Sequence, residues 1–300
     1  MVRKRHWSLP EVRNYSTDRI FAKLHEFGVE ITPDEFRQSV PAYYSHDDLV
    51  DDWEKHYDLT AEGYDKDFIL MAAIVLWQRL TPEVFSGDLM HDAIEQGYDY
   101  LKIHRDEKTC DIWLDCWDKF KAQFVPRLNA FSEIDEKLTG GLYLTSAWLL
   151  DIETELANAG LTNPEYQRKH LQYCEEFLQL FPDADEESLG YIKSGRAQAH
   201  LERGNTARGE ELFRQLVEEH PGFTWGYIHW GDIYWLKNYP HLEVDYQKAE
   251  DIYRMGLKYG EGDRQDVLER LKELEQARPQ GKGFGTTVQK KKGEKSQKKK

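Results

Sequence analysis

The sequence contains few cysteines and no paired cysteine motif. Cys110, Cys116 and Cys174 are the three cysteines among 300 residues, and no CxxC occurs. An odd number of scattered cysteines predicts neither a disulfide framework nor a thiolate zinc site. We therefore expect a reducing, cytoplasmic environment and no bound metal.

Long apolar runs are also missing. The longest, residues 68–77, is about half the length that a membrane-spanning helix requires. The basic start, MVRKRHWSLP, is not followed by the apolar stretch of a secretory signal peptide. These two absences predict a chain that is neither secreted nor held in a membrane.

The sequence lacks the common catalytic motifs. HExxH, GxSxG, a phosphate-binding loop and a dinucleotide-binding glycine loop are all absent. Two His-Asp pairs, His46-Asp47 and His91-Asp92, are of the kind that ligates metals in helical phosphohydrolases. With 11 histidines and a large excess of Asp, two such pairs are expected by chance. We predict a non-catalytic protein without a cofactor, and keep a helical metal-dependent hydrolase as an alternative.

Alternating runs of Val, Ile and Thr are rare, which argues against β-sheets. Helical spacing is common instead, and helix start signals such as Thr32-Pro33-Asp34-Glu35 precede it. We predict an all-α protein with four parts. These are a flexible N-terminus (1–15), a helical N-terminal domain (16–139), helical repeats with a capping helix (140–277) and a disordered Lys-rich tail (278–300).

Charge is distributed unevenly along the chain. The formal net charge is −15, yet residues 278–300 hold nine Lys or Arg and one Glu, which leaves −23 for the first 277 residues. An acidic body repels phosphates and anionic membrane surfaces, so the body favours basic protein partners. Contact with RNA or a ribosome is expected only through the tail.

Residues 190–276 contain landmarks of a repeated helix-turn-helix unit of 34 residues. The first unit has a small residue, a turn glycine, a large apolar residue and a closing proline in register, at Ala197, Gly204, Phe213 and Pro221. The second has corresponding residues at Trp230, Gly231, Tyr234, Ala249 and Tyr253, with an insertion near 237–242. A degenerate earlier unit, 142–182, has His170 and Cys174 where small and large apolar residues usually stand.

These residues resemble the tetratricopeptide repeat (TPR) family over about residues 142–276. The resemblance implies a short α-solenoid whose first helices line a concave groove for a protein or peptide segment. Mapped onto this sequence, the partner-binding residues of that groove are Tyr191, Ser194, Gln198, Trp225, Ile228, Asp232 and Trp235. The family's Lys, Asn and Arg clamp for a terminal carboxylate is not matched, so an acidic C-terminal ligand is disfavoured.

The expected function is therefore a TPR-like scaffold or adaptor with an aromatic and mildly acidic groove. The alternative is an RNA- or ribosome-associated factor anchored by its tail, because Lys-rich tails bind phosphates without reading sequence. The lysines that would make this contact are Lys290, Lys291, Lys292, Lys295, Lys298, Lys299 and Lys300. No zinc is expected in the tail, which has no cysteine.

Overall fold

The computed structural model describes residues 6–138, 144–236, 239 and 242–278. All regular secondary structure in this part of the chain is helical, as predicted. The first helices are α1 (Leu9–Arg13), α2 (Thr17–Glu26), α3 (Pro33–Ser39), α4 (His46–His56), α5 (Lys66–Leu80), α6 (Gly87–Leu101), α7 (Asp106–Gln123) and α8 (Ile134–Leu138). They are followed by α9 (Thr145–Gly160), α10 (Pro164–Leu180), α11 (Glu186–Glu202), α12 (Thr206–Glu219), α13 (Thr224–Asp232), α14 (Tyr246–Tyr259) and α15 (Arg264–Ala277). Short 3₁₀ helices are η1 (Val40–Ala42), η2 (Gly63–Asp65), η3 (Val125–Arg127) and η4 (Phe131–Glu133).

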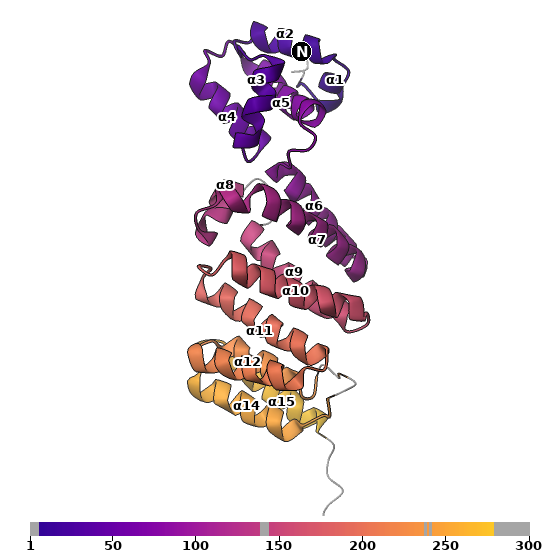
Figure 1. Ribbon diagram of the computed structural model, residues 1–300, viewed down its shortest axis with the longest axis vertical. Coiled ribbons are helices and arrows are strands. Elements are labelled where there is room, and N and C mark those ends of the chain that lie inside the picture. The colour runs from indigo at the N-terminus through magenta and orange to yellow at the C-terminus, as the bar shows by residue number, and fades with distance from the viewer. Residues whose placement is uncertain (1–5, 139–143, 237–238, 240–241, 279–300) are drawn as a thin grey trace, which may run out of the picture.

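The molecule is elongated, with α1 to α5 gathered at one end and the later helices stacked towards the other (Figure 1). Successive helices pack as pairs, namely α6 with α7, α9 with α10, α11 with α12 and α13 with α14. A second set of contacts joins α9 to α11, α11 to α13 and α13 to α15. From α9 onwards, the first helix of each pair therefore also touches the next first helix or, at the end, α15, whereas the α6/α7 pair contacts α9 through α7.

The N-terminal helices enclose their own core around α5. This helix contains the apolar run 68–77, and it packs against α1, α2 and α4. Residues 6–15 belong to this packing, although the sequence predicts flexibility there. Trp7 packs edge-on against Phe68, and Val12 is fully buried. A capping box between Ser8 and Glu11 starts α1. Residues 1–5 lie outside the described residues.

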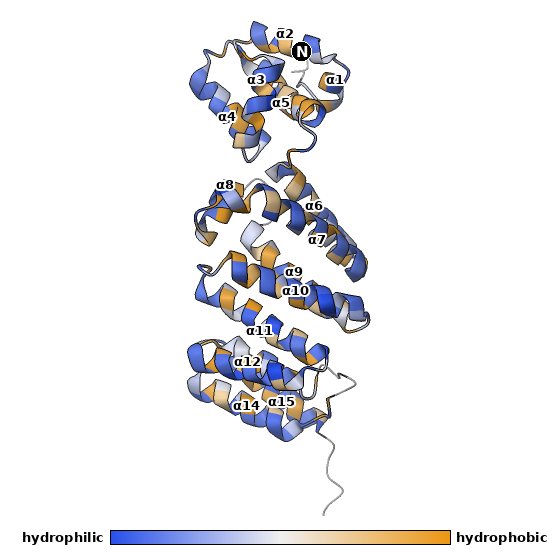
Figure 2. Cartoon of the chain, in the orientation of Figure 1, coloured by the Kyte–Doolittle hydropathy of each residue, from blue (hydrophilic) through white to orange (hydrophobic). Residues whose placement is uncertain are grey.

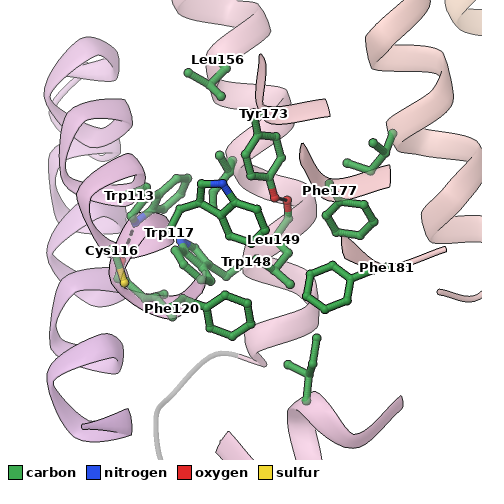
Figure 3. Packing of buried hydrophobic residues seen from close by; sticks show 14 of the residues in the cluster. Trp113, Cys116, Trp117, Phe120, Trp148, Leu149, Leu156, Tyr173, Phe177 and Phe181 are labelled. Carbon is green, nitrogen blue, oxygen red and sulfur yellow. Dashed lines mark hydrogen bonds between the residues drawn. The ribbon is translucent and has the colours of Figure 1, made fainter. Parts of the chain in front are cut away.

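A second core joins the middle helices. Side chains of α7, α9 and α10, among them Trp117, Trp148 and Phe177, point into one shared interior (Figure 3). Trp113 fits into the same core because residue 97 is glycine, where an added Cβ would lie 1.9 Å from the indole Nε1. This core extends from Met90 to Ile192, so helices on both sides of position 140 are packed together.

The third core holds the C-terminal helix pairs together. Ala197 on α11 and Phe213 on α12 are both fully buried. Gly204, at the turn between these helices, has a φ of +78°, a conformation that few residues other than glycine adopt. Gly231 on α13 lets α14 approach, because a Cβ at that position would lie 2.3 Å from Tyr253 Cε1. The predicted small positions are thus points of close helix contact.

Polar and apolar residues are interspersed along the helices (Figure 2), and α12 and α14 are typical of helices with one buried side. Because no long stretch is uniformly apolar, none of the helices in the described ranges has the length and hydropathy that crossing a bilayer requires. The last helix expected within 140–277 is present as α15, where Val267 and Leu274 are buried.

Candidate partner-binding surface

The structure places the seven predicted groove residues on α11, on α13 and just after α13. Four of them are buried, with less than a tenth of each side chain exposed; these are Ser194, Gln198, Ile228 and Asp232. Tyr191, Trp225 and Trp235 are partly exposed. The helix face that the repeat template assigns to ligand binding is therefore mostly covered by neighbouring helices.

Asp232 belongs to an internal hydrogen-bond network. Its carboxylate accepts a hydrogen bond from the Tyr253 hydroxyl on α14 and pairs with Arg270 Nε on α15 at 3.1 Å. The indole N–H of Trp235 donates to the same Tyr253 hydroxyl at 2.7 Å. These contacts join α13, α14 and α15, so Asp232 and Trp235 stabilise the last helices.

The other buried groove residues also have partners within the chain. Gln198 Nε2 donates to Glu202 Oε1 at 2.9 Å, one turn further along α11. Ser194 Oγ lies 2.9 Å from Nδ1 of His229 on α13. Ile228 is part of the third core. The Ser194 contact joins α11 to α13, whereas the Gln198 contact lies within α11. All three side chains are buried beneath the surface that a partner could reach.

Near Tyr191, four partly exposed rings form a group that we call the aromatic surface: Tyr191, Phe223, Trp225 and His229. Tyr191 lies at its centre, with ring centroids 5.4 Å from Phe223, 6.4 Å from Trp225 and 5.9 Å from His229. Trp225 and His229 are 5.5 Å apart, one helical turn apart on α13. The rings come from α11, α13 and the turn before α13, and they form one contiguous patch.

Three carboxylates act on Tyr191, the central ring of the aromatic surface. Burial raises the pKa of Tyr191 to about 12, and the negative charges of Glu187, Asp263 and Asp266 add to this rise. Glu187 lies in the first turn of α11, whereas the two aspartates lie at the start of α15. A ring with electron-rich faces and an acidic rim attracts a cation more strongly than it attracts a neutral or anionic group.

Sequence reasoning identified two rings of this patch and missed two. His229 follows Trp225 by four residues, so a helical projection of α13 places it on the same side. Phe223 lies before the helix begins and gives no such periodic signal. The sequence also gave no sign that Asp263 and Asp266 would act on Tyr191, because this depends on how α15 packs in the folded chain.

The two His-Asp pairs occupy separate structural positions. His46 Nδ1 pairs with Asp88 Oδ2 at 2.7 Å, and its backbone N–H donates to the same carboxylate. His91 Nε2 hydrogen-bonds the carbonyl oxygen of Leu138. Within the described ranges, neither pair belongs to a group with metal-binding geometry. The candidate tail lysines, from Lys290 onwards, lie outside the described residues.

Comparison with known proteins identifies no relative. The chain matches no protein-family model, no curated protein sequence and no solved structure. Its function is therefore argued from the geometry and chemistry of its own residues.

Proposed function

We propose that this chain is a non-catalytic, cytoplasmic scaffold or adaptor whose C-terminal helix pairs form a short TPR-like α-solenoid. The contacts that link α9, α11, α13 and α15 support this arrangement, since first-helix to first-helix packing is how such repeats stack. The close approaches at Ala197 and Gly231 support it further, because they occur at the small positions of the template.

The aromatic surface is the observation that carries the proposed binding function. Tyr191 and Trp225 offer large, partly exposed rings, and aromatic residues provide most of the binding energy in many interfaces. Glu187, Asp263 and Asp266 add negative charge around them. A ligand that suits both features is a protein segment with Lys or Arg side chains near an apolar residue.

The rings and the carboxylates are expected to contribute differently. A cation over an exposed aromatic ring contributes about 0.5–1 kcal/mol, and an exposed ion pair contributes roughly 0–1 kcal/mol. The carboxylates should therefore act mainly on the association rate and on selectivity for basic segments, while ring burial supplies affinity. Binding should weaken with added salt without being abolished.

A peptide-binding experiment with the full chain tests this proposal. The probes are a peptide of alternating Arg and Leu and its counterpart with Glu for Arg, compared by fluorescence anisotropy. We expect binding of the basic peptide, loss of that binding in the double variant Tyr191→Ala/Trp225→Ala, and retention in the control Tyr64→Ala, which removes an exposed ring in the N-terminal region. Equal binding by the double variant and the wild type would exclude the aromatic surface.

The tail supports a second candidate function, an RNA- or ribosome-associated factor. Nine Lys or Arg residues within 278–300 give this segment a charge opposite to that of the body. RNA binding through the tail should fall steeply with salt and disappear when residues 279–300 are removed. Peptide binding at the aromatic surface should survive the same truncation, so the two functions can be separated in one set of measurements.

A further inference from the structure

Three side chains with metal-binding atoms converge between α9, α10 and α11. Glu153 lies on α9, and His170 and Cys174 lie four residues apart on α10, so both face the same side of that helix. Their ligand atoms, a carboxylate oxygen, an imidazole nitrogen and the thiol sulfur, all lie within 4.8 Å of one another. His170 and Cys174 are fully buried, and the Glu153 side chain is 14% exposed.

The neighbouring helix leaves room for this convergence. Gly195 on α11 stands opposite Glu153, and a Cβ at that position would lie 2.2 Å from Glu153 Oε1. Any larger residue at position 195 would push the Glu153 carboxylate out of its place beside His170. Glycine is an unfavourable residue inside a helix, so its occurrence here has a local steric reason.

A second carboxylate fixes the orientation of the histidine ring. His170 Nδ1 lies 3.2 Å from Glu202 Oε2, and His170 Nε2 lies 2.8 Å from Glu153 Oε1. Glu202 is itself held by Gln198 Nε2 and by the Tyr239 hydroxyl, at 2.9 and 3.0 Å. A histidine that ligates a metal usually has a carboxylate or carbonyl on its other ring nitrogen, which is the place that Glu202 takes here.

We propose that Glu153, His170 and Cys174 form a binding site for a zinc ion. A carboxylate, an imidazole and a thiolate are all common zinc ligands, and the mixture is too soft for Mg²⁺ or Ca²⁺. In a tetrahedral zinc site the ligand atoms lie roughly 3.3–3.6 Å apart, so small side-chain rotations would bring these three atoms into place. Gln198, Glu202 and Tyr239 form the outer shell.

The partial exposure of Glu153 gives the site an entrance. A water molecule at that side would complete a four-coordinate zinc with three protein ligands. The ion would join α9 to α10 next to their contact with α11. It would offset two of the three negative charges that Glu153, Glu202 and a Cys174 thiolate bring together. The alternative is a metal-free network of the same side chains, in which His170 bridges Glu153 and Glu202.

Zinc binding to the untagged full chain distinguishes the two arrangements. The chain is first freed of metal with a chelator. Zn²⁺ is then added in the presence of a chromophoric chelator that competes for it, and the amount of zinc bound per chain is measured. We expect one zinc per chain in the wild type and in the control Cys116→Ser, which alters a buried cysteine outside the cluster. Binding should be lost in Cys174→Ser and weakened about 10- to 100-fold in Glu202→Gln, because outer-shell partners have effects of that size.

Cobalt provides a readout that depends on the sulfur itself. Co²⁺ bound at the site should give a thiolate-to-cobalt charge-transfer band in the wild type and in Cys116→Ser, but not in Cys174→Ser. If Cys174→Ser does not fold, Glu153→Gln is used in its place, and we expect this variant to bind one zinc ion fewer than the wild type. Absence of stoichiometric zinc in the folded wild type, or equal affinity in all variants, would overturn the proposal in favour of the metal-free network.

Discussion

Phe213 on α12 and Trp230 on α13 are stacked, with ring centroids 6.0 Å apart and planes only 3° from parallel. This pair joins α12 to α13, which follow each other in the chain. Trp230 is 7% exposed, whereas Trp225, five residues earlier on the same helix, is partly exposed in the aromatic surface. The two tryptophans therefore have different expected roles.

Replacing each of these tryptophans by alanine should separate stability from binding. Trp230→Ala removes a buried ring and should lower the free energy of unfolding by about 3–5 kcal/mol. Trp225→Ala should lower it by about 1 kcal/mol or less and abolish basic-peptide binding instead. Urea denaturation followed by circular dichroism measures the first effect. Similar losses of stability in both variants would contradict the assignment of Trp225 to the surface.

Removing the Tyr253 hydroxyl should destabilise the C-terminal helices. Tyr253→Phe leaves the Asp232 carboxylate without its α14 donor and the Trp235 indole without an acceptor. We expect a loss of about 1–3 kcal/mol, because buried polar groups then lose their partners. Tyr64→Phe, at a ring that is 47% exposed, is the matched control and should change stability little. An equally stable Tyr253→Phe would show that Asp232 does not depend on this hydrogen bond.

Gly195 should tolerate no larger residue. Although alanine is the better helix former by up to about 1 kcal/mol, the added methyl group would collide with Glu153. The displaced group is the flexible end of the Glu153 side chain, so the cost arises because the buried His170 ring loses its contact with Glu153. Losing a partner of a buried polar group costs about 1–3 kcal/mol, so Gly195→Ala should be destabilised overall. Gly222→Ala, whose added Cβ would lie no closer than 3.4 Å to a neighbour, is the control. Thermal unfolding of both variants provides the comparison, and a Gly195→Ala variant at least as stable as the wild type would be inconsistent with the contact.

The ion pair between His46 and Asp88 predicts a pH dependence of stability. Burial raises the pKa of Asp88, but the hydrogen bonds and charge of His46 outweigh this and leave the pKa below its ordinary value. A carboxyl group whose pKa is depressed by folding stabilises the protein above its unfolded pKa, about 3.9, and this stabilisation disappears as the pH falls through the folded pKa.

Unfolding in urea between pH 3 and pH 7 tests this effect. The stability difference between the wild type and Asp88→Asn should be present at about pH 5 and shrink below about pH 4. Asp92→Asn, an exposed position on the same helix, is the control and should follow the wild-type profile. A difference that stays the same at pH 3 and pH 7 would show that the His46 contact does not shift the titration of Asp88.

Local signals in the sequence predicted much of the fold. The capping box at Thr32 and Glu35 is present, and both of its hydrogen bonds are formed. The helix ends near Gly204 and Pro221 also agree with the structure. Such signals depend on residues close together in the chain, where backbone sterics and capping decide the outcome. The five-residue helix α1 was missed because it is too short to show periodicity.

The candidate site could be predicted only in part, since exposure depends on distant segments. Tyr191 and Trp225, which the repeat template assigns to one groove, have ring centroids 6.4 Å apart. The template gave no sign that the Asp232 carboxylate would bind Arg270 and Tyr253 of the same chain and so be unavailable to a partner. The zinc ligands had a weak signal in the four-residue spacing of His170 and Cys174, but the third ligand comes from another helix.

The hydrogen bond from Tyr239 to Glu202 links α11 to the segment that follows α13. Glu202 is the last residue of α11, and its other partners are Gln198 on the same helix and His170 on α10. Removing the segment that contains Tyr239 would leave this buried carboxylate with one donor fewer. Shortening the chain after α13 should therefore also destabilise the end of α11.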